Sequence, residues 1–247
     1  MRTSALALQS DHVTSRSIGW AALAPALVVP LLGSLLYFVW VPEGALGQAA
    51  YTLTKVFTLV YPLFFLRSIG ANGLTRRQDD QGARWPSWRS VALAGLGSGV
   101  LIAALGAALM LTPLGDLVRL GAGAATAKAD ALGFREHFVL FAIFISVIHS
   151  GLEEYYWRFF VYGQLREKCR PWVAHGIAAV AFAAHHLVLT LQFFSVGLAV
   201  FMAVAVAVGG LLWSLMYERQ GTVLGSWLSH LCVDAFLMVV AYQLVMG

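Results

Sequence analysis

The chain has 247 residues, of which 60% are apolar and only 11% charged, and its mean hydropathy is +0.76. About a quarter of the residues in a soluble domain are charged, so this composition indicates a membrane protein and excludes collagen-like, disordered and disulfide-rich secreted chains. The formal net charge is +4, yet the 16 Lys and Arg residues cluster between long apolar runs. That pattern is typical of membrane topology and does not predict nucleic-acid binding.

Apolar runs of bilayer-crossing length divide the chain. A hydrocarbon core of about 30 Å requires roughly 20 helical residues. The sequence offers seven such runs, at about 18–41, 45–66, 89–112, 136–163, 172–190, 193–216 and 222–245. We therefore expect an all-α fold, a polytopic transmembrane helix bundle of about seven helices. A polar loop at Ala71 to Ser87 links the second and third runs, and the spacing of Gly95 and Gly99 predicts a close helix contact.

The distribution of positive charge predicts the orientation. Eleven Lys and Arg residues fall in the N-terminal tail and in the second, fourth and sixth loops, whereas three fall on the other side, between 113 and 136. The positive-inside rule then places the N-terminus in the cytoplasm and the C-terminus outside. We expect a multi-pass integral membrane protein, in contact with the lipid bilayer of a bacterial inner (cytoplasmic) membrane.

The fourth run carries ionisable residues past the point where a lipid-facing helix would stop. Glu154 and Arg158 are four residues apart and therefore share a helix face, where they can pair. Glu153 lies about 100° around the helix from Glu154 and has no local cation to neutralise it. An unpaired carboxylate in a low-dielectric site is a candidate general base.

Two later helices carry matching polar pairs. Phe182 and His186 share one face of the fifth run, and His230 and Asp234 share one face of the seventh. A carboxylate and two histidines near mid-span on three helices can converge only around a common cavity, which is the geometry of a site that uses water.

Other polar residues in the runs have simpler interpretations. His149, His175 and His185 are expected to make only interhelical hydrogen bonds, with His185 pointing away from the face of His186. Lys55 is too deep to reach the interface fully, so it pairs with a carboxylate or lines the cavity. The two cysteines, Cys169 and Cys232, predict neither a disulfide framework nor a CxxC metal site.

Written as patterns, the polar residues read EExxxR from Glu153, FxxxH from Phe182 and HxxxD from His230. In this order on three late helices, they resemble the CPBP (Abi) family of intramembrane proteases, which includes CAAX prenyl endoproteases and bacteriocin-immunity relatives. The resemblance covers about residues 135–240. The apolar runs and the charge distribution predict a cytoplasmic tail at 1–17 and N-terminal transmembrane helices at 18–130, and the resemblance implies a CPBP-like catalytic transmembrane core at 131–247.

The resemblance also implies roles for the residues. Glu153 would activate a water for attack on a peptide bond, and His186 would hold that water. His230 and Asp234 would stabilise the oxyanion. Glu154, Arg158 and Phe182 would support the site.

One position departs from the family pattern, because Asp234 stands where the family commonly has Asn. An ionised aspartate cannot donate a hydrogen bond to an oxyanion. Either Asp234 is protonated in its apolar site, or it accepts a hydrogen bond that orients His230 while His230 alone donates.

The sequence is compatible with catalysis with or without a metal. Glu153, His186 and His230 could supply the three ligands of an open catalytic zinc site, which would make the protein a metalloprotease. The HExxH helix of the zincins is absent, and a ligating Glu153 would require another base. We expect no cofactor, with zinc as the alternative.

The leading functional hypothesis is an intramembrane endopeptidase, a hydrolase that cuts a hydrophobic or membrane-anchored protein or peptide. Two alternatives belong to other classes. A proton-coupled membrane transporter would also place a carboxylate and histidines in mid-membrane, although the sequence shows no repeat symmetry. A non-catalytic bacteriocin-immunity-type membrane protein would bind a toxin or its receptor and would tolerate substitution of the motif residues.

Overall fold

A computed structural model describes residues 18–41, 44–69 and 86–247, and every regular element among them is helical. The bounds are α1 Trp20–Leu35, α2 Gly44–Ile69, α4 Trp88–Met110, α5 Pro113–Arg119, α6 Ala122–Ala131, α7 Phe138–Ile143, α8 Ser150–Glu154, α9 Gly163–Arg166, α10 Pro171–Thr190, α11 Val196–Gln220 and α12 Leu224–Met246. The predicted all-α membrane bundle is therefore confirmed. The predicted tail at 1–17 and residues 71–85 of the predicted loop lie outside the described residues.

Six helices in the described part of the chain are long and apolar enough to cross a membrane. They are Trp20–Trp40, Trp88–Met110, Phe138–Arg166, Pro171–Thr190, Val196–Gln220 and Leu224–Met246. The protein is thus an integral multi-pass membrane protein. The run predicted at 45–66 coincides with α2, a helix of 26 residues that is not one of these six. The seventh span, the orientation of the termini and the division at residue 130 stay predictions.

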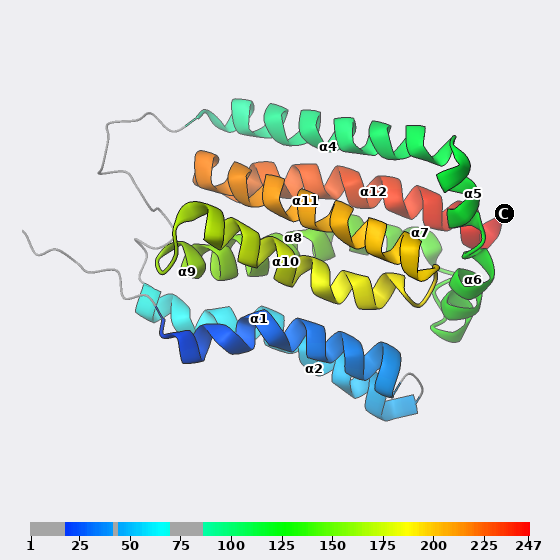
Figure 1. The fold of residues 1–247 in the computed structure, drawn as a ribbon, viewed down its shortest axis with the longest axis horizontal. Coiled ribbons are helices and arrows are strands. Elements are labelled where there is room, and N and C mark those ends of the chain that lie inside the picture. Colours follow the sequence, from blue (N-terminus) through cyan, green and yellow to red (C-terminus); the bar gives the residue numbers. More distant parts are fainter. Residues whose placement is uncertain (1–17, 42–43, 70–85) are drawn as a thin grey trace, which may run out of the picture.

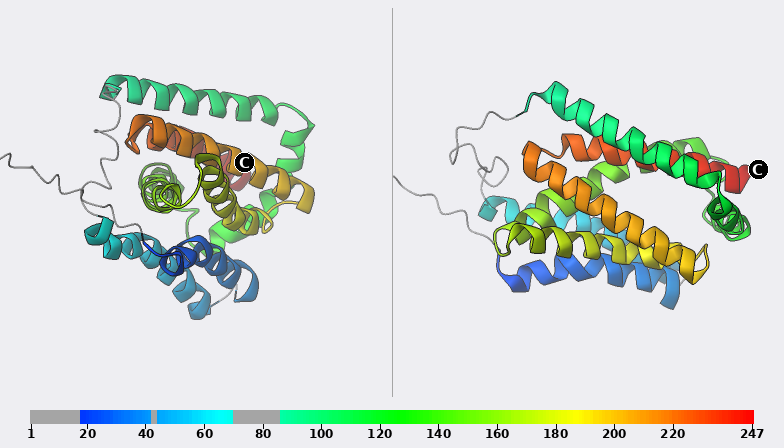
Figure 2. Two further views of the ribbon diagram at one scale, coloured as in Figure 1. Left: turned by 60° about the vertical axis from the view of Figure 1, so that its left-hand side comes forward. Right: turned by 45° about the horizontal axis from the view of Figure 1, so that its top comes forward.

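The helices form successive layers (Figure 1). The helix α4 lies along one side and packs on α12, while α11 packs on α10. On the opposite side, α1 packs on both α10 and α2. The short helices α5 and α6 lie across one end of the bundle, where they connect α4 to α7 (Figure 2).

Small residues let α4 approach α12 closely. A Cβ on Gly95 would lie 2.5 Å from the carbonyl oxygen of Gly225, and a Cβ on Gly99 would lie 2.6 Å from that of Ser229. Any side chain at these positions would therefore push the helices apart, which confirms the predicted GxxxG contact. At one end of the bundle, Gly221 adopts φ 66° and ends α11, which allows the short turn into α12.

One long helix, Phe138–Arg166, passes through the middle of the bundle and contains two π-helical stretches. The wider π-helical stretches Phe144–His149 and Tyr155–Tyr162 flank the α-helical turn α8, which carries Glu153 and Glu154. Local π-helical turns frequently occur at functional sites, because they redirect side chains without breaking the helix. The aromatic residues of the second stretch pack in the core, and Tyr156 donates a hydrogen bond of 2.7 Å to the carbonyl of Ala26 in α1.

Candidate active site

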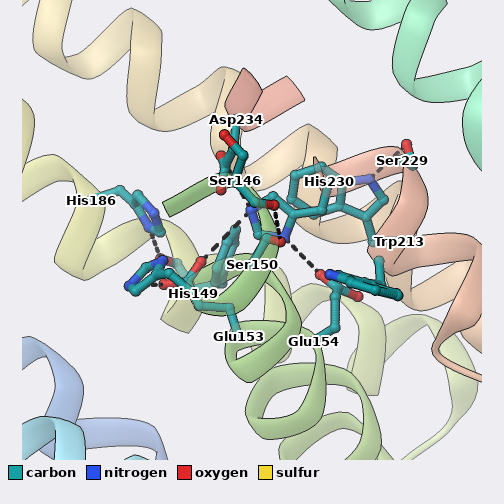
Figure 3. A network of polar contacts seen from close by, with 12 residues as sticks. Ser146, His149, Ser150, Glu153, Glu154, His186, Trp213, Ser229, His230 and Asp234 are labelled. Carbon is teal, nitrogen blue, oxygen red and sulfur yellow. Dashed lines mark hydrogen bonds and ion pairs between the residues drawn. The ribbon is translucent and has the colours of Figure 1, made fainter. Parts of the chain in front are cut away.

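The side chains predicted to form the site do converge, from α8, α10 and α12 (Figure 3). Glu153 Oε2 lies 3.7 Å from His230 Nε2. Asp234 Oδ1 lies 3.6 Å from the same nitrogen, which therefore faces two carboxylates. Glu153 and His230 are only 8% and 3% exposed, so the cluster lies inside the bundle.

The neighbouring carboxylate has a different environment. Glu154 is fully buried, and its Oε1 lies 3.1 Å from Arg158 Nη1 and 2.9 Å from His230 Nδ1. The pair with Arg158 was predicted from the four-residue spacing, whereas the contact with His230 spans 76 positions of sequence. Because the carboxylate only accepts hydrogen bonds, His230 Nδ1 carries a proton, and Nε2 is the nitrogen presented to Glu153 and Asp234.

Aromatic packing fixes the two groups that contact Glu154. The ring of His230 stacks on Trp213 with a centroid separation of 4.0 Å and an interplanar angle of 17°. The Arg158 guanidinium lies 5.0 Å from the centroid of the same indole and 4.4 Å from that of Phe182. Trp213 in turn donates a hydrogen bond of 3.0 Å to Ser229. Two contacts therefore fix the orientation of the His230 ring: Trp213 packs on one face, and Glu154 binds Nδ1.

His186 is oriented by its own helix. Its Nδ1 lies 2.8 Å from the carbonyl oxygen of Phe182, one turn earlier in α10. A carbonyl accepts and cannot donate, so Nδ1 carries the proton and Nε2 keeps its lone pair. The sequence placed Phe182 and His186 on one helix face. The backbone carbonyl of Phe182 determines which nitrogen of His186 is free to accept a hydrogen bond.

The prediction that His185 and His149 make only interhelical hydrogen bonds is wrong. Each places its Nε2 3.7 Å from Glu153 Oε1, so both belong to the cluster. His185 does not point away from the site; its ring stacks on Trp157 with an interplanar angle of 6°. The sequence carried one signal for His149, which precedes Glu153 by four residues and so shares its face. Adjacent residues 100° apart can also both border one cavity, as His185 and His186 do.

Lys55 completes the cluster from α2. Its Nζ lies 2.8 Å from His149 Nε2 and 5.4 Å from the centroid of the Tyr51 ring. The sequence left two roles open, pairing with a carboxylate or lining the cavity. Among the described residues no carboxylate lies within ion-pair distance of Lys55, so the second role agrees with the contacts.

One group of side chains in the described ranges could hold a metal ion. Ligand atoms of Glu153, His185 and His186 all lie within 4.8 Å of one another. This set differs from the expected one, because His185 takes the place of His230. One carboxylate and two imidazoles fit zinc in type, since catalytic zinc sites use two His and one Glu.

His175 behaves as predicted for a structural histidine. Its Nδ1 lies 2.9 Å from the Ser214 hydroxyl, and its Nε2 lies 2.9 Å from a carboxylate oxygen of Glu218. Arg166 donates a hydrogen bond of 2.7 Å to the other oxygen of Glu218. These contacts tie α9, α10 and α11 together away from Glu153, so they stabilise the bundle.

Comparison with known proteins identifies the part of the chain that holds this cluster. Residues 135–236 match the family model described as Rce1-like, type II CAAX prenyl endopeptidase. The match confirms the resemblance to the CPBP family and supports a CAAX-protease-type membrane endopeptidase. A search of curated proteins and a search of solved structures found no similar protein. The matched segment includes α8, α10 and the part of α12 that carries His230 and Asp234, but not Lys55.

Proposed function

We propose that this chain, whose Rce1-like segment carries Glu153, His186 and His230, hydrolyses a peptide bond of a membrane-associated substrate with a water activated by Glu153. The observation that carries the proposal is the unequal environment of the two adjacent glutamates. Glu154 is committed to Arg158 and His230. Glu153 faces imidazole nitrogens at 3.7 Å instead, which leaves its oxygens able to accept a proton.

The proposed reaction has the following order of proton transfers. Glu153 takes one proton from the water as the water oxygen attacks the scissile carbonyl carbon, while His186 Nε2 accepts a hydrogen bond from the second water O–H and so orients the water. The negative charge that develops on the carbonyl oxygen is stabilised by His230, whose Nε2 donates when the ring is protonated beside Glu154. Glu153 then delivers its proton to the leaving amine, which restores the carboxylate.

In the proposed reaction Asp234 acts beside His230. Its oxygen lies 3.6 Å from His230 Nε2, which suits either role that the sequence left open. A protonated Asp234 donates to the oxyanion beside His230, as a neutral acid in an apolar site does. An ionised Asp234 orients the protonated ring instead. Substitution of Asp234 by Asn separates these roles.

A metal-dependent form of the same activity is the second candidate, and it is favoured by one observation, the group of Glu153, His185 and His186. These three residues would hold the ion. A bound zinc ion supplies Lewis-acid polarisation and a more acidic water. In that form Glu153 is a ligand, and the proton acceptor must be another group.

The membrane location restricts the substrate class. The surface of the bundle carries many exposed Leu, Val and Phe side chains, as expected for helices in contact with lipid. A buried site among such helices receives its substrate from the bilayer, so we propose a hydrophobic or lipid-anchored protein or peptide. We propose no nucleic-acid partner.

The test is terminal-peptide proteomics in the native host. A chromosomal Glu153→Gln variant is compared with wild type and with Glu136→Gln, which changes an exposed glutamate outside the cluster; membrane levels are matched by blot. The proposal expects longer terminal peptides of particular membrane or secreted proteins in Glu153→Gln alone. If no peptide changes in Glu153→Gln although deletion of the whole gene has a phenotype, the proposal that Glu153 is catalytic is wrong. An immunity-type binding role or a proton-coupled transporter, tested by flux in liposomes, then becomes the better hypothesis.

A further inference from the structure

Ser150 supports the π-helical stretch Phe144–His149, which comes shortly before Glu153 in the long helix through the bundle. In an α-helix the Ser150 N–H would bind the carbonyl of Ser146, four residues earlier. Here it binds the carbonyl of Ile145, five residues earlier, so the Ser146 carbonyl loses its α-helical donor. The Ser150 hydroxyl donates to that carbonyl instead, at 2.5 Å. The backbone and the side chain of Ser150 thus both stabilise the π-helical pattern (Figure 3).

A second side chain binds the same stretch from α12. Trp227 Nε1 donates a hydrogen bond of 3.1 Å to the carbonyl of Val147, across 80 positions of sequence. Gly151 allows this approach, because a Cβ at Gly151 would lie only 3.2 Å from Trp227 Nε1. An indole N–H inside the bundle is costly when it has no partner. The hydrogen bond therefore fixes the π-helical stretch against α12.

Trp227 shares one face of α12 with the groups that lie near Glu153. Trp227, His230 and Asp234 are three and four residues apart, so they lie on one side of the helix. His230 Nε2 lies 3.7 Å from Glu153 Oε2, and Trp227 binds the turn just before Glu153. One face of α12 thus carries both the imidazole that meets the base and the indole that binds the helix of the base.

The winding of this helix decides where Glu153 points. A π-helical turn holds about one residue more than an α-helical turn, so loss of one π turn would rotate the following residues by about 100°. His185 and His230 belong to other helices, α10 and α12, and would not follow that rotation. Their contacts with Glu153, both at 3.7 Å, would be lost. Glu153 therefore depends on the π-helical stretch to face these two histidines.

We propose that Trp227 and Ser150 are positioning residues, which hold the π-helical stretch and so direct Glu153 toward His185 and His230. Neither side chain takes part in the proton transfers. Without either hydrogen bond the stretch relaxes to α-helical winding, the much commoner pattern, and the base turns away from its partners. The expected effect on cleavage rests on the proposed function, whereas the expected effect on geometry does not.

The first test is cleavage of one lipidated hydrophobic peptide by the full-length protein in lipid nanodiscs. Trp227→Phe keeps an aromatic ring but removes the N–H, and Ser150→Ala removes only the hydroxyl. We expect each variant to lower kcat by at least about tenfold and to keep KM within about threefold of wild type, as for a misplaced catalytic group. Wild-type kcat in Trp227→Phe overturns the proposal.

Matched controls make the same chemical changes elsewhere. Trp172→Phe removes an indole that is 71% exposed at the start of α10. Ser226→Ala removes a fully buried hydroxyl that donates within α12, to the carbonyl of Val223. Both variants should keep the wild-type kcat. A loss in Ser226→Ala as large as that in Ser150→Ala overturns the specific role of Ser150.

Two glycine substitutions in the long helix separate positioning from folding. Gly151→Ala places a methyl group 3.2 Å from Trp227 Nε1 and so displaces the indole, whereas a Cβ on Gly163 meets only the Arg158 carbonyl, at 3.8 Å. Alanine is a better helix former than glycine, so both variants should keep the wild-type unfolding temperature. We expect kcat to fall in Gly151→Ala and to persist in Gly163→Ala. Equal kcat in the two variants would contradict the role of the indole contact.

A structural measurement separates this proposal from the proposed reaction. Solid-state NMR of the full-length protein in lipid bilayers, with ¹³C-labelled Glu and ¹⁵N-labelled His, measures the coupling of the Glu153 carboxyl carbon to imidazole nitrogens. The Glu153 signal is identified by its absence in Glu153→Gln. We expect wild-type coupling in Ser226→Ala and weaker coupling in Trp227→Phe, even if no peptide is cut and the protease hypothesis fails. A Trp227→Phe variant with wild-type coupling overturns the proposal, whatever its kcat.

Discussion

His230 Nδ1 contacts Glu154 Oε1 at 2.9 Å, although the two residues are 76 positions apart. This contact connects a salt bridge inside one helix to the histidine that faces Glu153 from another helix. Glu154 therefore has two partners, one that neutralises its charge and one that it orients. The adjacent glutamates of the sequence thus have separate tasks, support for Glu154 and proton transfer for Glu153.

Substitution of Glu154 should harm both stability and cleavage. Glu154→Gln leaves Arg158, which is 2% exposed, without its counter-ion. Loss of one partner of a buried ion pair costs about 3–5 kcal/mol, so the unfolding temperature measured in detergent should fall by several degrees. The control is Asp116→Asn, which breaks an ion pair on the surface and should change little. An unchanged unfolding temperature in Glu154→Gln would contradict the supporting role.

Asp234→Asn distinguishes the two roles of Asp234. If Asp234 is a protonated donor, the amide of Asn replaces its hydrogen bond, and kcat should stay within about threefold of wild type, which is below the usual effect of one lost oxyanion donor. Asp234→Leu, which can neither donate nor accept, should then lower kcat by about 100-fold. The measurement is cleavage of one lipidated peptide at matched protein level. A large loss in Asp234→Asn would instead show that the charge of Asp234 is required beside His230.

His185 decides between the glutamate and the metal forms of the reaction. Because its Nε2 lies 3.7 Å from Glu153 Oε1, His185→Gln should lower cleavage in either form. Only in the metal form should it also reduce zinc bound to the purified protein, measured by atomic emission. His175→Gln is the comparison variant, since it changes a buried histidine bonded to Ser214 and Glu218. We expect no stoichiometric zinc in wild type and undiminished cleavage after chelation; metal that leaves with His185 would reverse this expectation.

The contact of α4 with α12 should influence where His230 lies, although α4 is outside residues 135–236, which match the family model. Gly99→Leu would place a side chain where even a Cβ lies 2.6 Å from the Ser229 carbonyl, so α12 must shift and move His230. Gly97→Leu is the control on the same helix, because nothing lies within 4 Å of its Cβ position. We expect cleavage to fall at least tenfold in Gly99→Leu, as misplacement of catalytic groups causes, and to persist in Gly97→Leu. Equal activity of the two variants would show that this contact does not position His230.

Much of the site follows from relationships within single helices. The four-residue spacing pairs Glu154 with Arg158 and directs His186 onto Phe182, and the structure contains both contacts. The apolar run lengths likewise predict the all-helical bundle, because a bilayer leaves helices as the only open-chain solution. Such features depend on helical periodicity alone, so the sequence by itself determines them.

The contacts between helices were decided only by the tertiary structure. His230 contacts Glu154, Lys55 contacts His149 across 94 positions, and His185 faces Glu153. Periodicity fixes which residues share a face, but it leaves open how each helix rotates about its axis and which helix is its neighbour. Those choices come from packing, here from the glycine contact of α4 with α12 and from the aromatic residues around Trp213.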